Sequence, residues 1–407
     1  MEVFFMNSIG IDVSKGKSMV AVLRPLGEVV RAPFEVNHTV DGLSSLVKDL
    51  KALDGASKVF MECTGSYHLP IANALTKAGF KVHTLNPVLI KNFGNNSIRN
   101  VKTDKADALK IANYGLTYWN EVTDYSPEDD IRFKLKNYYR QYSQYIKLRT
   151  AMKNNFTSLI DLTFPDINTL FSSTARKSDG HQKWIDFSLR FWHRDCVAGL
   201  SLNAFTLTYK TWCAIHKYNF SKSKAAQIHS FARQCSCIIP KDEDTKVLIA
   251  QAIKQLNSFN ESVNAISKQA TQLAMQLPEY SIVIQMFGVG EITAFQLMAE
   301  IGDIHRFPKK SSLVCYAGLD TEPKDSGKVT TKSRDITKKG SPYLRRTLFL
   351  IVSNILMLSP PDDPIYQFID RKRSEGKHYY TYICAGAAKF LRIYYARVKE
   401  YLDNRSD

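Results

Sequence analysis

The sequence predicts a mixed α/β domain at the N-terminus, followed by two regions built of helices. Two observations support this prediction. Residues 8–118 alternate short apolar runs with segments of helical periodicity, whereas from about residue 128 the apolar side chains recur at helical spacing. The predicted domains are residues 1–125, 126–276 and 277–407, and a chain of 407 residues is long enough for two or three cores.

The first domain begins with three short strands joined by tight turns and continues with alternating helices and strands. This order predicts a mixed sheet that carries helices on its faces. The predicted strands are residues 8–13, 18–23, 28–36, 57–61 and 80–85, and the predicted helices are residues 40–52, 67–78 and 104–117.

The second region is predicted to contain two long helices that form a hairpin. Residues 131–160 and 244–277 each place apolar side chains near helical spacing. The pattern is typical of a coiled coil that joins two copies of the chain, and also of a helical domain that buries its own apolar stripe. Several Tyr side chains of residues 131–160 lie beside Lys and Arg, which permits base stacking, although a Tyr stripe at this spacing more often belongs to a core.

The third region is predicted to be helical, with a tight turn at its start. Gly288 and Gly290 precede a helix over residues 291–301, and such a turn exposes backbone N–H groups that hold phosphate in helix-hairpin-helix elements. A purely structural turn explains the two glycines equally well. The remaining predicted parts are a helix over 309–317, a polar loop over 320–340 and a basic helix that begins at 341.

The composition favours a nucleic-acid partner. The formal net charge is +16 and the pI is about 9.3, with Lys and Arg spread along the chain. Seven cysteines, an odd number without framework spacing, indicate a reducing compartment. The start lacks a signal-peptide pattern, and no run reaches the ~18 apolar residues of a membrane span. We therefore expect a cytoplasmic protein without membrane contacts.

Four acidic residues fall where a ribonuclease-H-like domain would bring carboxylates together. Asp12 lies in the first strand, Glu62 follows a later strand, and Asp104 and Asp107 share one face of the helix that starts near Thr103. Two carboxylates about 4 Å apart at an effective dielectric near 20 repel by roughly 4 kcal/mol, so such a cluster requires a cation or raised pKa values. Hard oxygen ligands favour Mg²⁺ or Mn²⁺, and two such ions can clamp a phosphodiester.

Each of these acids also has a structural explanation. Asp104 fits a helix N-cap, with Asp107 in the first turn where it favours the helix dipole. Asp12 and Glu62 fit turn residues at strand ends. The order of the four along the predicted fold favours the metal site.

Two sets of motifs carry a family resemblance. The N-terminal set is residues 10–15, 62–68 and 102–108, and the C-terminal set is residues 288–290, 299–303, 306–307, 316–319, 326–328 and 338–340. In order and spacing they resemble the DEDD-type insertion-sequence transposases of the group numbered one hundred and ten, which includes the Piv-like DNA invertases. The middle of the chain matches only in being helical. One position departs from the pattern, because Phe287 stands where the family usually has Pro.

The resemblance implies a fold, a reaction and partners. It implies a RuvC-like N-terminal domain whose four acids hold Mg²⁺ and a C-terminal domain with a nucleophilic serine, which aligns with Ser326. Such proteins recombine the ends of a DNA element with a target, and members of the family are guided by a structured bridge RNA. The implied assembly is a dimer or tetramer that joins the acids of one subunit to the serine of another.

A serine nucleophile suits this chemistry, because a phosphoserine ester keeps the bond energy that hydrolysis would discard. Basic residues near it are candidates for stabilising charge on the phosphate and for binding nucleic acid: Lys102, Lys328, Lys338, Lys339, Arg345 and Arg346. Without the resemblance, Ser326 would be one more loop serine.

Four functions remain open at this point. The first is an RNA-guided DNA recombinase, and the second is a metal-dependent nuclease that cuts junctions without a covalent intermediate. The third is an actin-like sugar or acetate kinase, because residues 10–15 resemble a first phosphate loop, although the second loop and the adenosine motif are missing. The fourth is a protein that binds nucleic acid without cutting it, which the four intact acids argue against.

Overall fold

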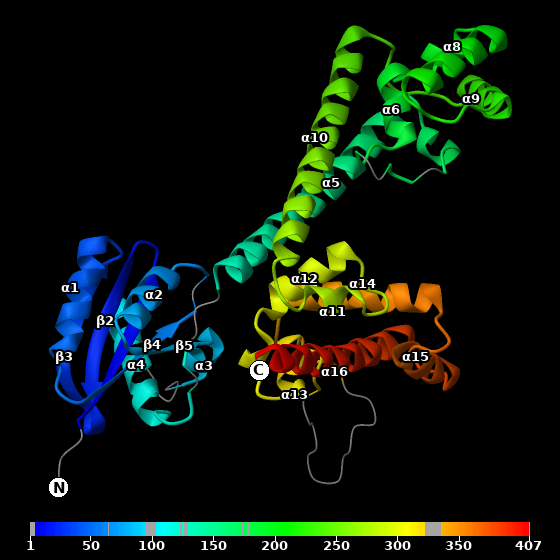
Figure 1. Cartoon of the computed structure of the whole chain (residues 1–407). Helices are drawn as coiled ribbons and strands as arrows, with labels where there is room; N and C mark the ends of the chain where they lie inside the picture. The colour runs from blue at the N-terminus through cyan, green and yellow to red at the C-terminus, as the bar shows by residue number, and fades with distance from the viewer. Residues whose placement is uncertain are drawn as a thin grey trace, which may run out of the picture. The chain divides into compact units, whose positions relative to one another are not determined.

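The computed structural model describes residues 5–63, 65–93, 103–122, 124–125, 129–172, 174–176, 179–321 and 335–406 (Figure 1). The chain divides into two compact units, Met1–Pro127 and Glu128–Asp407. The further division predicted at residue 276 stays a prediction.

Unit 1 contains a five-stranded mixed sheet with the strand order β3-β2-β1-β4-β5. Strands β1 to β3 pair antiparallel in sequence order, whereas β4 pairs parallel with both β1 and β5. The strands are β1 (Met6–Ser14), β2 (Lys17–Arg24), β3 (Glu28–Asn37), β4 (Ala56–Glu62) and β5 (Lys81–Leu85). The predicted mixed sheet is confirmed.

Helices cover both faces of this sheet. On one face, α1 (Val40–Lys51) and α2 (Leu69–Lys77) pack on the buried side chains of Ile9, Ile11 and Val59. On the other face, Phe60 packs with residues of α3 (Pro87–Asn92) and α4 (Asp104–Thr117). The two cores follow from the alternation of side chains along each strand.

Helix α4 lies directly on the backbone of β1 because the residue beneath it has no side chain. A Cβ added to Gly10 would lie 2.2 Å from the carbonyl oxygen of Ala108 and 2.3 Å from the backbone nitrogen of Ala112. The Ser8 hydroxyl donates a hydrogen bond of 2.7 Å to the Ala112 carbonyl. A Cβ added to Gly115 of α4 would lie 2.3 Å from the ring carbon Cδ2 of Phe60. These small residues set the position of α4 above β1 and β4.

Unit 2 is built around two long antiparallel helices, α5 (Asp130–Asp161) and α10 (Glu243–Ala274), which pack along each other (Figure 1). The predicted helical hairpin is therefore confirmed. The carboxylates of Asp129 and Asp242 cap the first turns of α5 and α10 by accepting from backbone N–H groups.

A small helical subdomain, which the sequence did not predict, joins the far ends of the hairpin. Its core is rich in aromatic side chains, among them Phe164, Phe187, Tyr209 and Trp212, and it includes Phe156 of α5. Its elements are η2 (Ile167–Leu170), α6 (Lys183–Arg190), α7 (Asp195–Ala198), α8 (Leu202–Ile215) and α9 (Lys222–Gln234). Of these elements, η2 and α7 have four residues each, which is too short to give a periodic signal.

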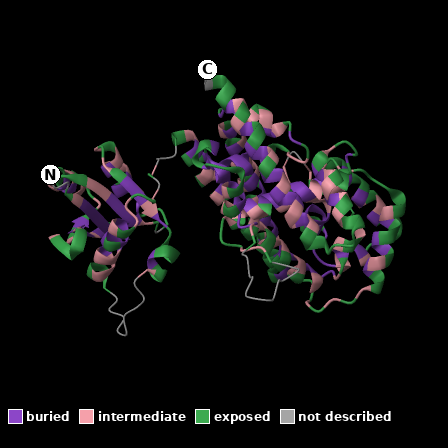
Figure 2. Ribbon diagram, turned by 90° about the horizontal axis from the view of Figure 1, so that it is seen from below, coloured by how far each residue is buried: buried purple, intermediate pink, exposed green. Residues whose placement is uncertain are grey.

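The base of the hairpin belongs to the core of the C-terminal helices. Helix α12 belongs to this core, and its residues 293–301 are all buried. Figure 2 shows the buried residues of the chain in purple. Leu135, Tyr139 and Tyr142 of α5 join the same core, which shows that two of the Tyr side chains of the stripe are structural. The helices are α11 (Tyr280–Ile284), α12 (Glu291–Ile301), α13 (Lys310–Tyr316), α14 (Pro342–Leu358), α15 (Pro364–Ser374) and α16 (Tyr379–Ser406). None of the described helices has the length and apolar character needed to cross a membrane.

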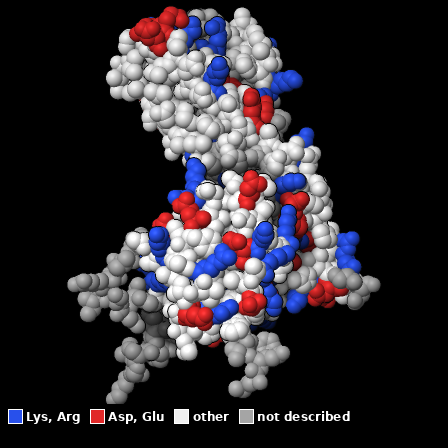
Figure 3. Space-filling view, turned by 90° about the vertical axis from the view of Figure 1, so that its left-hand side faces the viewer, with Lys and Arg blue, Asp and Glu red and all other residues white. Residues whose placement is uncertain are grey.

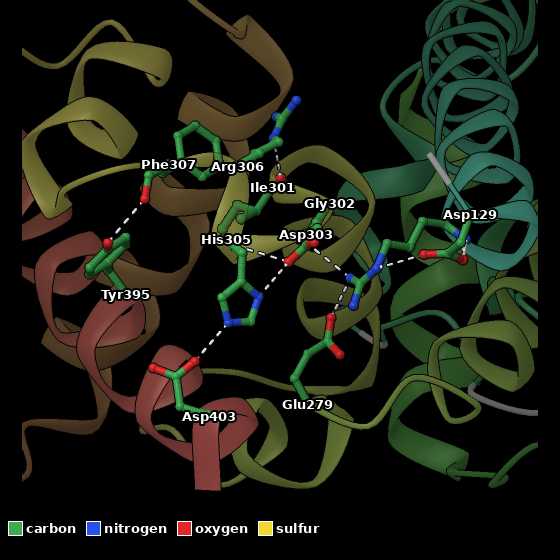
Figure 4. Close-up of polar contacts among 11 residues, drawn as sticks. Asp129, Glu279, Ile301, Gly302, Asp303, His305, Arg306, Phe307, Tyr395 and Asp403 are labelled. Atoms are coloured by element: carbon green, nitrogen blue, oxygen red, sulfur yellow. Dashed lines mark hydrogen bonds and ion pairs between the residues drawn. The ribbon is translucent and has the colours of Figure 1, made fainter. Parts of the chain in front are cut away.

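A buried ion pair fixes the first turn of α5 to this core (Figure 4). The guanidinium of Arg132 pairs with the carboxylate of Glu279, which is 1% exposed, and donates a hydrogen bond of 3.1 Å to the Gly302 carbonyl. Its Nε lies 2.9 Å from an Asp129 carboxylate oxygen. The start of α5, the residue before α11 and the end of α12 are therefore held together.

A histidine extends the polar contacts to the last helix. The Nδ1 of His305 lies 2.9 Å from an Asp303 oxygen, and its Nε2 lies 2.8 Å from an oxygen of Asp403 on α16 (Figure 4). The hydrogen bonds to Asp403 and Asp303 raise the pKa of His305. The two ring nitrogens of His305 thus contact carboxylates on both sides, and the ring links α16 to the end of α12.

We expect Gly10→Ala to destabilise unit 1 by about 1–3 kcal/mol, because the new methyl group would overlap the α4 backbone and force the helix away from β1. Scanning calorimetry of the full chain measures this as a lower melting temperature. Asn113→Ala on the exposed side of α4 is the matched control and should leave the transition unchanged or raise it slightly. A Gly10→Ala chain that melts like the wild type would contradict the proposed packing.

Candidate functional site

Asp12 and Glu62 lie next to each other at the ends of two parallel strands. In the β1–β4 pairing, Gly10 is opposite Phe60 and Ile11 is opposite Met61, so each acid is the next residue beyond the pairs of this register. Gly10 and Phe60 face α4. Because side chains alternate along a strand, Asp12 and Glu62 also face α4.

The first turn of α4 supplies the other two acids. Its N-cap is Thr103, whose hydroxyl accepts a hydrogen bond of 3.2 Å from the Ala106 N–H. The alternative in which Asp104 is the N-cap is therefore wrong, although Asp104 and Asp107 both lie in the first turn, where a negative charge favours the helix dipole. Asp107 directly precedes Ala108, whose carbonyl lies over Gly10.

The electrostatics of the site show that the four carboxylates influence one another. Burial raises the pKa of Asp12 to about 6, and the charges of Asp107 and Asp104 add to this shift. Burial also raises the pKa of Glu62, with further contributions from Asp12 and Asp107 and an opposing one from Lys110. The acids predicted from the sequence therefore converge, and a negative field exists where they meet.

The four acids lie near one another but are not arranged as the ligands of one metal ion. Within the residues that the structure describes, no three His, Cys, Asp or Glu side chains lie close enough together to hold one metal ion. Both observations hold, because charges act on each other over several ångströms whereas metal ligands must come within about 2.0–2.6 Å of the ion. The donor chemistry fits a hard divalent cation, and the mutual repulsion supplies a reason to bind one.

The candidate serine and basic residues fall into three groups. Ser326, Lys328 and Lys102 lie outside the described residues. Lys338, Lys339 and Arg346 are exposed, which phosphate binding requires. On the face drawn in Figure 3, Lys and Arg side chains are interspersed with Asp and Glu. The basic excess is therefore distributed over that face among acidic side chains.

The third group, Arg345, has a structural role. Its Nη1 donates hydrogen bonds of 2.9 Å to the Ala317 carbonyl and 3.1 Å to the Gly340 carbonyl. Nearby, Thr321 pairs with Ile336 in an antiparallel bridge, and the Thr337 N–H donates to the Asp320 carbonyl at 2.8 Å. The two described ends of the segment that includes Ser326 are thus held side by side.

The glycine turn before α12 is at least partly structural. Gly288 has a φ of +77°, and an added Cβ would lie 2.6 Å from Ile355 Cγ1 and 2.9 Å from the Ile351 carbonyl oxygen. Its own carbonyl accepts a hydrogen bond of 3.3 Å from Asn354. An added Cβ at Gly290 meets nothing within 4 Å, so this residue leaves open space before α12. Phosphate binding by the turn stays a prediction.

A buried carboxylate that the sequence did not reveal positions the start of α14. Glu300 of α12 is 0% exposed, and its Oε2 accepts hydrogen bonds of 2.6 Å from the Ser341 hydroxyl and 3.0 Å from Arg140 of α5. Arg140 also lies over the Tyr343 ring, with its guanidinium carbon 3.6 Å from the centroid. This network joins α5, α12 and α14 beside the base of the segment 322–334. The only sequence signal was an acid inside an apolar helix.

The pKa of Asp12 predicts a pH-dependent stability. A carboxyl whose folded pKa is raised contributes stability that is present below its unfolded value of 3.8 and is lost as the pH rises through about 6. In the presence of a chelator, unit 1 should therefore melt at a lower temperature at pH 7.5 than at pH 5. Asp12→Asn should reduce this difference, with Glu62 retaining part of it, and should raise stability at pH 7.5 by about 1–2 kcal/mol. Added Mg²⁺ should stabilise the wild type more than the variant, and equal responses would contradict a cation site.

The Glu300 network predicts an asymmetric pair of substitutions. Arg140→Met should cost about 3–5 kcal/mol, because it leaves the fully buried Glu300 carboxylate without its cation. Glu300→Gln should cost less, about 1–3 kcal/mol, because the Arg140 side chain is 36% exposed and can be hydrated. Denaturant unfolding of both single variants and the double variant measures the coupling. The exposed Glu243→Gln is the control, and equal costs for the two single variants would contradict the geometry.

Comparisons with known proteins match both ends of the chain. Residues 9–165 match the model of DEDD-type IS110 transposases, and residues 280–367 match the model described as "Transposase IS116/IS110/IS902 family". A solved structure of T. thermophilus RuvC in complex with a Holliday junction substrate aligns with a TM-score of 0.24 and 13% identity, covering 30% of this chain and 99% of RuvC.

Curated relatives match over part of their length. The 43.6 kDa protein of insertion element IS110 from Streptomyces coelicolor is 24% identical over 163 residues, which is 40% of this chain and 39% of the relative. The 42 kDa protein of IS900 from Mycobacterium paratuberculosis is 24% identical over 40% of each chain. The pilin gene-inverting protein of Moraxella bovis is 29% identical over 36% of this chain and 46% of the relative. The matched part thus spans less than half of each of these relatives.

Because the two models describe one family and together match more than half of the chain in the expected order, the chain belongs to the IS110 family of transposases.

Proposed function

We propose that the protein is a DNA transposase or site-specific recombinase that cuts and rejoins the ends of an insertion sequence. The observation that carries this proposal is the convergence of Asp12, Glu62, Asp104 and Asp107 from two strand ends and one helix start. Family membership supports the DNA substrate, and the net charge of +16 supports binding of a polyanion.

The four acids are proposed to hold Mg²⁺ or Mn²⁺ beside the scissile phosphate. A bound divalent cation would supply charge stabilisation to the oxygens of the reacting phosphate. Asp12 and Glu62 stand on the rigid sheet, whereas Asp104 and Asp107 approach from α4, so the site combines fixed carboxylates with two from the end of a helix.

Ser326 is proposed as the nucleophile, as the family resemblance implies. Its hydroxyl oxygen would attack the phosphorus, lose its proton and form a phosphoserine ester while the bond to a DNA oxygen breaks and that oxygen leaves as a hydroxyl. Attack by a second DNA hydroxyl on the ester would rejoin the DNA and release the serine. The exposed Lys338, Lys339 and Arg346 lie near the described base of the segment that holds Ser326 and are suited to bind phosphates.

The same resemblance supports two further parts of the proposal. A structured guide RNA would select the target, and a dimer or tetramer would bring the acids of one subunit to the serine of another. The hairpin of α5 and α10 offers a long helical surface for that assembly.

A junction-cutting nuclease without a covalent intermediate is the second candidate. Convergence of the acids favours it, because a metal-activated water at such a site hydrolyses a phosphodiester without any serine.

The two candidates differ in the fate of the DNA end. We expect labelled DNA that contains an element end to form an adduct with the full chain that survives denaturing gel electrophoresis, with the phosphate on Ser326 by mass spectrometry. Ser326→Ala and Asp12→Asn should each abolish it, whereas Ser333→Ala in the same segment is the matched control and should retain it. Cleavage by Ser326→Ala at the wild-type rate, without an adduct, would favour the nuclease.

A further inference from the structure

The start of α16 exposes two neighbouring tyrosine rings. Tyr379 is 40% exposed and Tyr380 is 61% exposed, and their ring centroids lie 5.3 Å apart. His378, also exposed, lies 5.7 Å from Tyr380 with an interplanar angle of 34°. Neither tyrosine hydroxyl has a hydrogen-bond partner among the described residues. Single exposed rings are ordinary, whereas here three rings adjoin one another on the surface.

These rings rest on a firm support. The ring of Phe349 on α14 lies 6.2 Å from Tyr379 and 6.3 Å from Tyr380, and Tyr382 lies 5.4 Å from Tyr379. Phe349 and Tyr382 are partly buried against the C-terminal core. The exposed rings are therefore held in place before any ligand arrives, which lowers the conformational entropy lost on binding.

Cations border the ring group. The segment 371–377 carries Arg371, Lys372, Arg373 and Lys377 but one acid, Glu375. Lys372 pairs with Glu375 at 2.8 Å, and Arg371 lies 4.0 Å from it. Within the part of the chain that the structure describes, Arg373 has no carboxylate within 4.0 Å, and Lys377 and His378 are exposed. The segment that leads directly into the ring group thus carries a net positive charge.

Two further cations, Arg346 and Lys338, belong to the same part of unit 2 as the ring group. Arg346 is exposed and precedes Phe349 by three residues, so both lie on one side of α14. Burial raises the pKa of Cys384 on α16, and the charge of Lys338 opposes this shift. Both cations border the base of the segment that includes Ser326.

We propose that His378, Tyr379 and Tyr380, supported by Phe349 and bordered by Arg373 and Lys377, form a stacking platform for unpaired bases of a DNA strand. Flat rings offer their faces to bases, and the cations pair with phosphates between those bases. Paired bases in a duplex hide their faces, so the platform selects single strands. The choice of DNA rests on the proposed function, because strand exchange at an element end exposes unpaired nucleotides.

The test is a binding titration in which no DNA is cut. Fluorescence anisotropy is measured with a labelled single strand of about 12 nucleotides in a chelating buffer, using the full chain with Ser326→Ala as the background. Adding Tyr379→Ala and Tyr380→Ala together should weaken single-strand binding by roughly 10-fold or more. Binding of the same sequence as a duplex should stay within about twofold, because paired bases do not use the platform.

Three controls keep the result interpretable. Tyr379→Phe with Tyr380→Phe keeps both rings and should bind like the background chain. Met357→Ala changes a side chain that is 76% exposed at the far end of α14 and should also have no effect. Because the substituted rings are exposed, the melting temperature should stay the same for every variant.

Unchanged single-strand binding by the double alanine variant would overturn the proposal, and so would an equal loss for single strand and duplex. A loss confined to RNA of the same sequence would also overturn it, because the occupant would then be an RNA strand. The binding assay needs no catalysis. A failure of the proposed recombinase chemistry would therefore appear in the adduct experiment and would not change the binding result.

Discussion

The approach of α4 to the backbone of β1 across Gly10 is the constraint on which the candidate site depends. With no side chain between helix and strand, the first turn of α4 lies above the end of β1, where Asp12 projects. Any larger residue would move Asp104 and Asp107 away from the two strand carboxylates. The site therefore depends on Gly10, two residues before Asp12, because its small size lets Asp104 and Asp107 approach the strand carboxylates. Burial and the neighbouring negative charges raise the pKa values of Asp12 and Glu62.

The two units differ in whether their carboxylates have cationic partners within the protein. In unit 1 the four carboxylates lie near one another, and their mutual repulsion favours binding of an external cation. In unit 2 the two most buried acids of the described residues have internal cations, since Glu279 pairs with Arg132 and Glu300 pairs with Arg140. Breaking one of the buried ion pairs of unit 2 should destabilise the fold. Replacing one of the four acids of unit 1 should stabilise the fold but reduce catalysis. This contrast separates structural acids from functional ones.

The fold followed from the sequence wherever a periodic pattern was long or sharply bounded. The five strands of unit 1, the arms α5 and α10 and the helix after Gly290 belong to this class. The separate elements of the distal subdomain did not, and for Asp195–Ala198 the reason is that four residues are too few to show a period. The roles of Glu300 and Arg345 depend on partners 160 and 28 residues away, which no local pattern encodes. The acids were found by their order along predicted strands, while Ser326 rests on family resemblance, since nothing local distinguishes it from Ser333.

Helix α5 runs without interruption from the fixed pairs at Arg132, through the C-terminal core, to the aromatic core of the distal subdomain. At 1.5 Å per residue its 32 residues form a rod about 48 Å long. A stiff rod clamped at one end works as a lever, so a tilt of about 5° at the clamp displaces the tip by roughly 4 Å. Such a tilt would also move Arg140, whose contact with Glu300 helps to position the start of α14, so the orientation of α5 couples the distal subdomain to the packing beside Ser341.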